Sequence, residues 1–163
     1  MLLRIATEDD YNRIVEIYNQ AVDDGFCTAD TNHVTVEGRI GWFRQHHSEK
    51  YPIFVAVNEG TVTGWCSLSP YRPGRKALRT ASEISYYIDR NYRKQGIGGR
   101  LIHHTLRQAP LFGFKNVFAI LLDVNENSIR LLEKNGFVQW GHLPEIADFD
   151  GTRCGQFIYG RKV

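Results

Sequence analysis

The chain has little of what marks secreted, membrane-spanning or nucleic-acid-binding proteins. Its three cysteines, an odd number at wide spacing, fit neither a disulfide framework nor a metal site. No apolar run approaches the roughly 20 residues of a membrane-spanning helix. The formal net charge is only +2, with acidic and basic residues interspersed. We therefore expect reduced thiols, a cytoplasmic location, and no nucleic-acid or membrane partner.

Length and composition fit one globular domain that covers residues 1–163. A chain of 163 residues can bury a proper core, and its 42% hydrophobic and 23% charged residues are ordinary fractions. Met1–Ile5 is too short for the apolar part of a signal peptide. No internal repeat, linker or low-complexity tract interrupts the pattern.

The spacing of apolar residues predicts strands and helices along the whole chain. The expected strands cover residues 2–5, 53–57, 61–67, 81–88, 117–122, 137–140 and 153–161, and the expected helices begin near residues 9, 35, 97 and 127. The order β-α-α-β-β-β-α-β-α-β-β predicts an α/β domain with a mixed sheet of about seven strands and about four helices.

A glycine-rich, cationic turn, Tyr92–Arg100, lies between the strand expected over 81–88 and the helix expected from residue 97. A turn at this place directs free backbone N–H groups and the positive end of the helix dipole at one point, which suits a pyrophosphate. Gly96 and Gly98 would let the backbone approach the phosphates closely. An ordinary turn with solvated cations is the alternative interpretation.

Two common phosphate-binding motifs do not fit this turn. A dinucleotide fingerprint needs a third glycine where the chain has Leu101. A P-loop needs Gly-Lys-Ser/Thr, and the chain has Gly98-Gly99-Arg100.

Three motifs together resemble the GNAT N-acetyltransferase superfamily, over essentially the whole chain. They are Arg93-x-x-Gly96-x-Gly98, Asn125-x-x-Ser128 and Asn135-Gly136-Phe137. Within it the chain is similar to the phosphinothricin acetyltransferase branch, which includes acetyltransferases of methionine sulfone and methionine sulfoximine. The segments that carry this similarity are Ile17–Ala21, Tyr71–Pro73, Glu83–Ile88 and Trp140–Pro144.

The resemblance implies the GNAT acyl-CoA N-acyltransferase fold, acetyl-CoA as donor, a small amino acid or analogue as acceptor, and a homodimer. It makes Lys94–Gly99 the pyrophosphate cradle, and it has the backbone of Tyr86–Ile88 pair with the pantetheine arm like an added strand. The implied cofactor-binding residues are Tyr86, Tyr87, Ile88, Arg93, Lys94, Gln95, Gly96, Ile97, Gly98, Gly99, Asn125, Ser128 and Lys134.

Two of these residues have simpler alternative roles. Asn125 would bond the cofactor near the thioester, but it could equally cap the following helix. Lys134 would contact the nucleotide end, but it could be a solvated cation at a helix end.

Glu83 is the predicted catalytic residue. The substrate ammonium must lose a proton before it attacks a thioester, and strand alternation puts Glu83 on one face with Ser85 and Tyr87. A surface ion pair with Arg79 or Arg72 is the alternative. A backbone N–H of Tyr86–Ile88 would stabilise the oxyanion.

The chain departs from the family pattern at the proton donor. Many GNAT proteins have a tyrosine that protonates the leaving thiolate seven residues after the position of Asn125, and this chain has Leu132 there. Because a thiol with a pKa near ~8.5 can leave as thiolate, we name no general acid.

The expected acceptor site combines Glu83 with a basic loop and one aromatic residue. Its candidate residues are Phe26, Arg72, Lys76, Ala77 and Leu78. Arginine can hold a carboxylate or phosphinate bidentately. The alternatives are a solvated loop for residues 69–76 and plain core packing for Phe26.

Two histidine pairs, His46-His47 and His103-His104, are predicted to be solvated and to bind no metal, because adjacent helical residues point to different faces. For the whole chain, two further functions remain open. One is acetylation of a protein N-terminus or lysine, and the other is a non-catalytic acyl-CoA-binding module.

Overall fold

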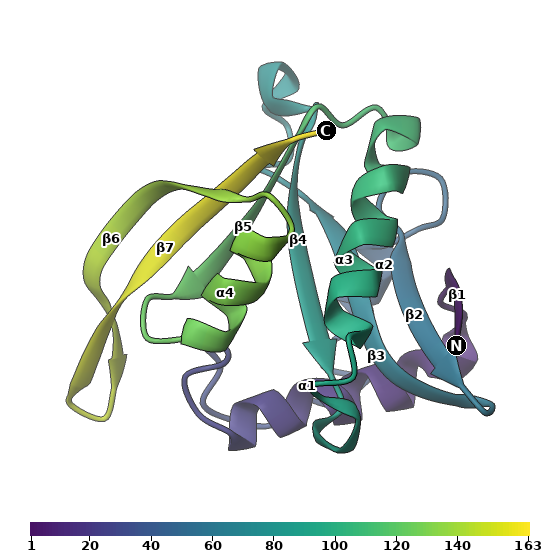
Figure 1. Ribbon diagram of the computed structural model, residues 1–163, viewed down its shortest axis with the longest axis horizontal. Coiled ribbons are helices and arrows are strands. Elements are labelled where there is room, and N and C mark those ends of the chain that lie inside the picture. The colour runs from purple at the N-terminus through teal and green to yellow at the C-terminus, as the bar shows by residue number, and fades with distance from the viewer.

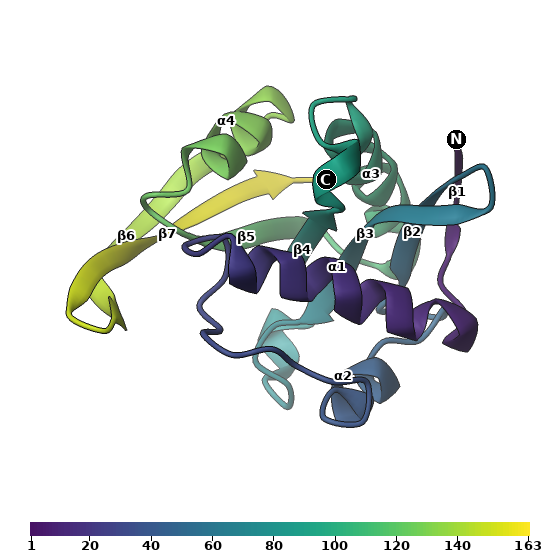
Figure 2. The same cartoon turned by 90° about the horizontal axis from the view of Figure 1, so that it is seen from below.

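The computed structural model describes residues 1–163 as a seven-stranded sheet with helices on both faces (Figures 1 and 2). The strands are β1 (Leu2–Ile5), β2 (Ile53–Asn58), β3 (Thr61–Pro70), β4 (Ala81–Ile88), β5 (Asn116–Leu122), β6 (Val138–Phe149) and β7 (Thr152–Lys162). The helices are α1 (Tyr11–Asp23), α2 (Ile40–Gln45), α3 (Ile97–Gln108) and α4 (Glu126–Lys134). The predicted order of elements and the mixed sheet are confirmed.

The strand order is β1-β2-β3-β4-β5-β7-β6, antiparallel except between β4 and β5. Figure 2 shows α1 and α2 on one face and α3 and α4 on the other. Because successive strand residues point to opposite faces, the sheet contributes to two hydrophobic cores. Phe54, Leu68 and Ile84 pack toward α3. Val55 and Trp65 pack toward α1. No helix is long and apolar enough to cross a membrane.

The parallel pair of strands at the centre of the sheet is incomplete. β4 and β5 pair at only three positions, Ala81 with Asn116, Ser82 with Val117, and Glu83 with Phe118. Beyond Glu83 the two strands diverge, as Figure 1 shows. The edge of β4 from Ile84 to Ile88 therefore has no strand partner on that side, and its backbone groups are available to a ligand.

Element boundaries differ from the expectations where a local contact or bulge intervenes. The second helix begins at Ile40, because Thr35 Oγ1 accepts a hydrogen bond from Gly38 N (3.0 Å) in a turn ahead of it. The last hairpin is longer than expected, with β6 reaching Phe149 rather than Trp140. Two register shifts, one spanning Pro144, let this edge strand continue through a residue without an N–H.

The prediction of solvated histidines is wrong for His46. His46 is 9% exposed and packs beside the Trp42 ring, with ring centroids 4.0 Å apart. His47 and His103 are exposed, and His104 is half-buried against Phe54 (4.8 Å). The chain turns inward at His46, directly after the last residue of α2. Helical spacing could not predict this burial, because His46 lies outside the helix.

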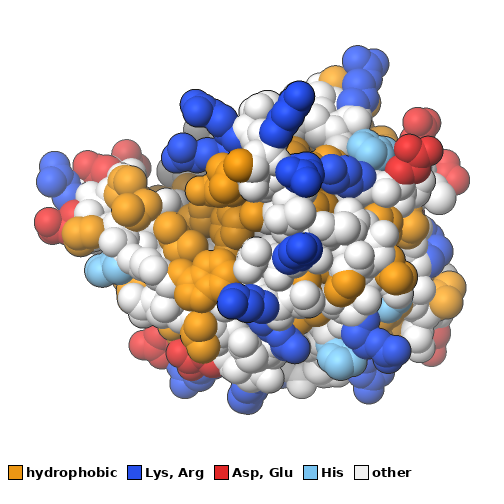
Figure 3. Space-filling model, turned by 90° about the horizontal axis from the view of Figure 1, so that it is seen from above, with side chains coloured by type: hydrophobic (Ala, Val, Ile, Leu, Met, Phe, Trp, Pro, Cys, Tyr) orange, Lys and Arg blue, Asp and Glu red, His pale blue; other side chains and the backbone are white.

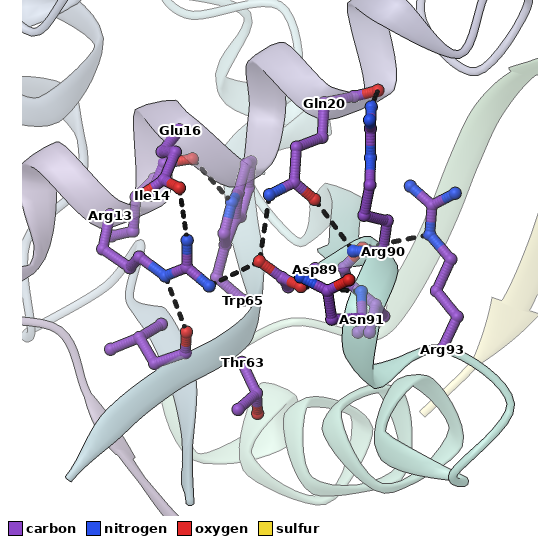
Figure 4. Close-up of polar contacts among 12 residues, drawn as sticks. Arg13, Ile14, Glu16, Gln20, Thr63, Trp65, Asp89, Arg90, Asn91 and Arg93 are labelled. Atoms are coloured by element: carbon purple, nitrogen blue, oxygen red, sulfur yellow. Dashed lines mark hydrogen bonds and ion pairs between the residues drawn. The ribbon is translucent and has the colours of Figure 1, made fainter.

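A buried carboxylate holds the end of β4 against α1 (Figure 4). The Asp89 side chain is 1% exposed and accepts hydrogen bonds from Arg13 Nη2 (2.5 Å), Gln20 Nε2 (2.9 Å) and Asn91 N (2.8 Å). Burial alone would raise the pKa of Asp89, but these donors outweigh it and hold the pKa below its usual value. The segment that leads from β4 into the glycine turn is therefore fixed to α1, which lies on the face of the sheet opposite to α3 (Figure 2).

Replacing this carboxylate should weaken the fold in a pH-dependent way. Asp89→Asn should lower the free energy of unfolding at pH 7 by roughly 3 kcal/mol, near the lower end for a broken buried ion pair, because Arg13 keeps some contact with water. Since the pKa of Asp89 is lowered by folding, its contribution is complete above about pH 4 and is lost as pH falls through the folded-state pKa.

Urea unfolding at several pH values measures this difference. Glu126→Gln is the control, because the Glu126–Arg130 pair lies on the surface with side chains 76% and 64% exposed. If the difference in free energy of unfolding between wild type and Asp89→Asn stayed constant from pH 7 to pH 2, the ionised Asp89 carboxylate would not be its cause.

Candidate active site

A cleft of about 1100 Å³ occupies the opening between β4 and β5. Its walls come from the free edge of β4, the facing part of β5, the glycine turn and the first turn of α4. The glycine turn follows the last residue of β4, and the basic loop after β3 precedes its first residue, so they lie at opposite ends of one strand. Figure 3 views the molecule from the side of that loop and shows an apolar hollow bordered by Lys and Arg side chains.

The glycine turn has the geometry that the sequence predicts for an anion site. Lys94 (φ 61°) and Gly96 (φ 79°) both adopt the left-handed conformation, which brings the chain directly into α3. The amides of Ile97, Gly98 and Gly99 in the first turn of α3 have no partner within the helix, and these three residues line the cleft. Gly98 allows close packing on α4, since a Cβ there would lie 3.0 Å from Leu131 Cδ2.

Arg93 is partly engaged in the structure itself. Its Nη1 lies 2.6 Å from Asp24 Oδ2 and its Nε donates to Ile88 O (3.2 Å). Lys94 and Arg100 form no ion pair with an acidic side chain. Arg93 thus fixes the turn to the end of α1, and the backbone amides remain available to an anion together with Lys94 and Arg100.

The structure brings the expected cofactor residues together almost completely. The cleft is lined by Tyr86, Tyr87, Ile88, Arg93, Lys94, Gly96, Ile97, Gly98, Gly99, Asn125, Ser128 and Lys134. Gln95 is the exception: it points away from the cleft and its Nε2 donates to Asn91 O (3.3 Å). These residues come from β4, the glycine turn with the start of α3, and α4, so their convergence is a property of the fold.

The expected acceptor residues converge less well. Glu83 lines the cleft, whereas Phe26, Arg72 and the segment 76–78 do not. Phe26 instead packs on Phe149, with ring centroids 4.8 Å apart. The loop 72–79 is exposed throughout, so its residues border the site from outside.

Glu83 is half-buried and makes no ion pair. The alternative of a surface pair is wrong, because Arg79 donates to Lys76 O (3.0 Å) and Arg72 lies over the Tyr71 ring (5.8 Å). Burial raises the pKa of Glu83. An unpaired carboxyl group of raised basicity in a cleft is suited to take a proton from a substrate.

The first turn of α4 supplies polar groups to the cleft. Asn125 Oδ1 accepts a hydrogen bond from Ser128 N (3.2 Å), so Asn125 caps the helix as well as lining the cleft. The Tyr86 hydroxyl lies 2.5 Å from Ser128 Oγ and bridges β4 to α4. Leu132 is fully buried, so this position contributes only to packing.

An aromatic wall lies at the α1 side of the cleft, and of its four residues only Tyr87 was named as a site residue in the sequence analysis. It consists of Tyr18, Trp42, Trp65 and Tyr87. Tyr18 OH donates to Asp30 Oδ2 (2.6 Å), which also pairs with Arg39. The sequence signal that could have pointed to Tyr18 is its place among the apolar residues that recur at helical spacing in α1, and this pattern indicates burial but not a cleft.

The site can hold an extended ligand along β4. Its free edge offers backbone hydrogen bonds, the turn offers amides for an anion at one end, and Glu83 offers a base at the other. The aromatic wall would cover the apolar part of a second ligand next to Glu83.

Comparison with known proteins agrees with this arrangement. Residues 11–137 match the family described as the Acetyltransferase (GNAT) family. The chain belongs to this family, and its sheet and helices form the GNAT acyltransferase fold.

Individual relatives cover nearly the whole chain. YwnH of Bacillus subtilis (strain 168), provisionally named a phosphinothricin acetyltransferase, is 40% identical over 100% of this chain and 99% of its own length. The L-methionine sulfoximine/L-methionine sulfone acetyltransferase of Salmonella typhimurium is 27% identical over 97% of this chain and 90% of its own. A crystal structure of a Sinorhizobium meliloti phosphinothricin acetyltransferase in complex with AcCoA matches with a TM-score of 0.92 at 27% identity, covering 99% of this chain and 88% of that one.

The raised pKa of Glu83 can be measured without any ligand. In protein labelled with ¹³C at the glutamate carboxyl carbon, the Glu83 signal should titrate with a midpoint above the ordinary value of about 4.3. Glu83→Gln identifies the signal by removing it. A midpoint at or below the ordinary value would mean that solvent reaches this carboxyl freely.

Proposed function

We propose that the protein transfers the acetyl group of acetyl-CoA to the amine of a small amino acid or analogue, of the phosphinothricin, methionine sulfoximine or methionine sulfone type. The observation that carries this proposal is the early divergence of β4 from β5, which leaves the edge Ile84–Ile88 free between the glycine turn and Glu83. Membership of the GNAT family and the names of the relatives support the donor and the class of acceptor.

The donor would lie along the free strand edge. The amides of Lys94–Gly99 would hold its pyrophosphate, and the backbone of Tyr86–Ile88 would pair with the amides of its pantetheine arm. Asn125 and Ser128 would border the thioester end, and Lys134 the nucleotide end. This arrangement uses each part of the cleft that the structure brings together.

Glu83 would act as the general base. It takes one proton from the acceptor ammonium, and the neutral amine attacks the thioester carbonyl carbon. The new C–N bond gives a tetrahedral adduct, and a backbone N–H of Tyr86–Ile88 would stabilise its negative oxygen. When the adduct collapses, the C–S bond breaks with its electron pair going to sulfur, and the nitrogen gives its second proton to the departing thiolate or to water. A thiol with a pKa near ~8.5 leaves without a dedicated acid, consistent with a buried Leu132.

The acceptor's acidic group would meet the basic loop. Arg72 lies over Tyr71, and Tyr71 packs edge-on against Phe118 (4.6 Å). Phe118 is in turn the strand partner of Glu83. These contacts, which run from Arg72 to the strand partner of Glu83, support Arg72 and Lys76 as acceptor-binding residues, with Ala77, Leu78 and Phe26 at the margin of the proposed acceptor site.

We also propose that the chain is one domain, acts in the cytoplasm and forms a homodimer. Strand β6 lies at the edge of the sheet, and Val138 (59%), Trp140 (47%) and Ile146 (58%) are exposed on it. Apolar side chains on an unpaired strand edge favour association with another protein surface.

Calorimetry and a thiol-release assay test the function together. Coenzyme A should give binding heat, and phosphinothricin, methionine sulfoximine or methionine sulfone should release thiol from acetyl-CoA. Glu83→Gln should lower kcat/KM by about 10²- to 10⁴-fold with the coenzyme A heat unchanged, because it removes only the base. Peptides with a free N-terminus or a lysine test the protein-acetylating alternative.

The outcomes separate the hypotheses. Heat without turnover of any acceptor favours the non-catalytic module. Absence of heat at millimolar coenzyme A contradicts the whole assignment.

Arg72→Ala should separate the two substrates. It should raise KM for the amino-acid acceptor roughly 10- to 100-fold, the effect of a lost charged hydrogen bond, and leave KM for acetyl-CoA nearly unchanged. Arg75→Ala, an exposed cation of the same loop, is the matched control. Equal increases in both KM values would argue against a role in acceptor binding.

A further inference from the structure

His46 has an environment that core packing alone does not require. It follows the last residue of α2, is 9% exposed, and lies between α2 and β3. Both ring nitrogens are engaged: Nδ1 lies 2.7 Å from Trp42 O, and Nε2 lies 3.0 Å from Ser69 Oγ. The ring thus connects the main chain of α2 to one hydroxyl on β3.

The partners of the ring fix where its proton lies. A carbonyl oxygen can only accept, so Nδ1 carries the hydrogen and donates it to Trp42 O. Burial, the largest effect, lowers the pKa of His46; the Trp42 carbonyl opposes this, and His47 lowers it further. The ring is therefore neutral near pH 7, and its bare Nε2 accepts the single hydroxyl proton of Ser69.

Ser69 lies directly across the sheet from Glu83. The two residues are partners in the antiparallel β3–β4 register, so their side chains leave the same face with Cβ atoms about 4.5–5.5 Å apart. The backbone here is held further by Ser82 Oγ, which donates to Ser69 O (2.9 Å). Because its proton is given to His46, the Ser69 oxygen offers only lone pairs toward Glu83.

We propose that His46 is a positioning residue that acts through Ser69, by fixing the hydroxyl so that its oxygen accepts a hydrogen bond from Glu83 once that carboxyl has taken the acceptor's proton. This inference deepens the proposed function and rests on it for the role of Glu83. In the step itself, the N–H bond of the ammonium breaks, an O–H bond forms on Glu83, and that O–H donates to Ser69 Oγ.

The arrangement makes Glu83 a stronger base. A lone pair facing the carboxyl group disfavours its charged form and stabilises its protonated form, which adds to the effect of burial. The neighbouring His47 lowers the pKa of His46, burial is the cause of the raised pKa of Glu83, and Arg72 and Arg79 lie on the loop that precedes β4. Neither arginine forms an ion pair with Glu83, so Ser69 is the polar neighbour whose orientation matters.

Two single variants and their combination test whether His46 acts on Glu83 through the Ser69 hydroxyl. Ser69→Ala removes the acceptor and should lower the titration midpoint of Glu83 by about 0.5 to 1 pH unit. His46→Phe frees the Ser69 proton to donate to the carboxylate and should lower the midpoint further. In the double variant the value should return to that of Ser69→Ala, because His46 acts only through the hydroxyl.

The midpoint is read in two independent ways. The ¹³C signal of the Glu83 carboxyl carbon gives it in the ligand-free protein, and the acidic limb of the pH profile of kcat/KM gives it during turnover. Ser69→Thr keeps a hydroxyl and should restore the wild-type midpoint in both. A merely structural role of His46 would change stability without this order of midpoints.

An unchanged midpoint in Ser69→Ala, or additive shifts in the double variant, would overturn the inference. If His46→Phe does not fold, Ser69→Ala and Ser69→Thr still decide it. Midpoints in the expected order without acetylation of any acceptor would contradict the proposed function but leave the His46–Ser69–Glu83 coupling in place.

Discussion

The Asp89 carboxylate is the interaction on which the position of the glycine turn depends. It lies at the end of β4, on the sheet's central strand, and binds two side chains of α1 and one amide of the turn segment. A second link, between Arg93 and Asp24, ties the turn to the end of the same helix. The anion site is thus built against α1, although α1 lies on the other face of the sheet from α3.

These links explain why the cations around the turn are not equivalent. The Arg93 guanidinium pairs with Asp24 and donates to the Ile88 carbonyl. The first amides of α3, by contrast, have no partner within the helix. Recognition of a phosphate here depends on oriented main-chain dipoles, and the nearby lysine and arginine side chains supply a more diffuse attraction.

Much of the fold could be predicted because its signals are local. The alternation of Ala81–Ile88, the glycines before α3 and the Asn135-Gly136 helix end are each readable within a few residues. The glycine turn could be identified as a candidate anion site from such local signals, whereas the other expected cofactor residues, on β4 and α4, came from the resemblance to the GNAT family. Gln95 is the expected cofactor residue that does not line the cleft, because its side chain donates to Asn91 O instead.

The features that sequence could not predict depend on contacts between distant segments. His46 is buried against β3, where it contacts Ser69. Trp65 contacts Tyr18 and Trp42 only after α1 and α2 pack on the sheet. Strand β6 extends because bulges accommodate Pro144. The acceptor half of the cleft is made of such contacts. Its residues carry no shared spacing along the chain, so no period or motif marks them.

The early separation of β4 from β5 has a mechanical consequence. Strands β1 to β4 pair with the rest of the sheet, β5, β7 and β6, at three positions, and the core beneath α3 and the Tyr86–Ser128 contact also connect the two parts. A molecule bound between β4 and β5 would contact both parts of the sheet and link them. Binding of the first substrate would restrict the motion of the two parts relative to each other. The second substrate would then bind to a more rigid surface.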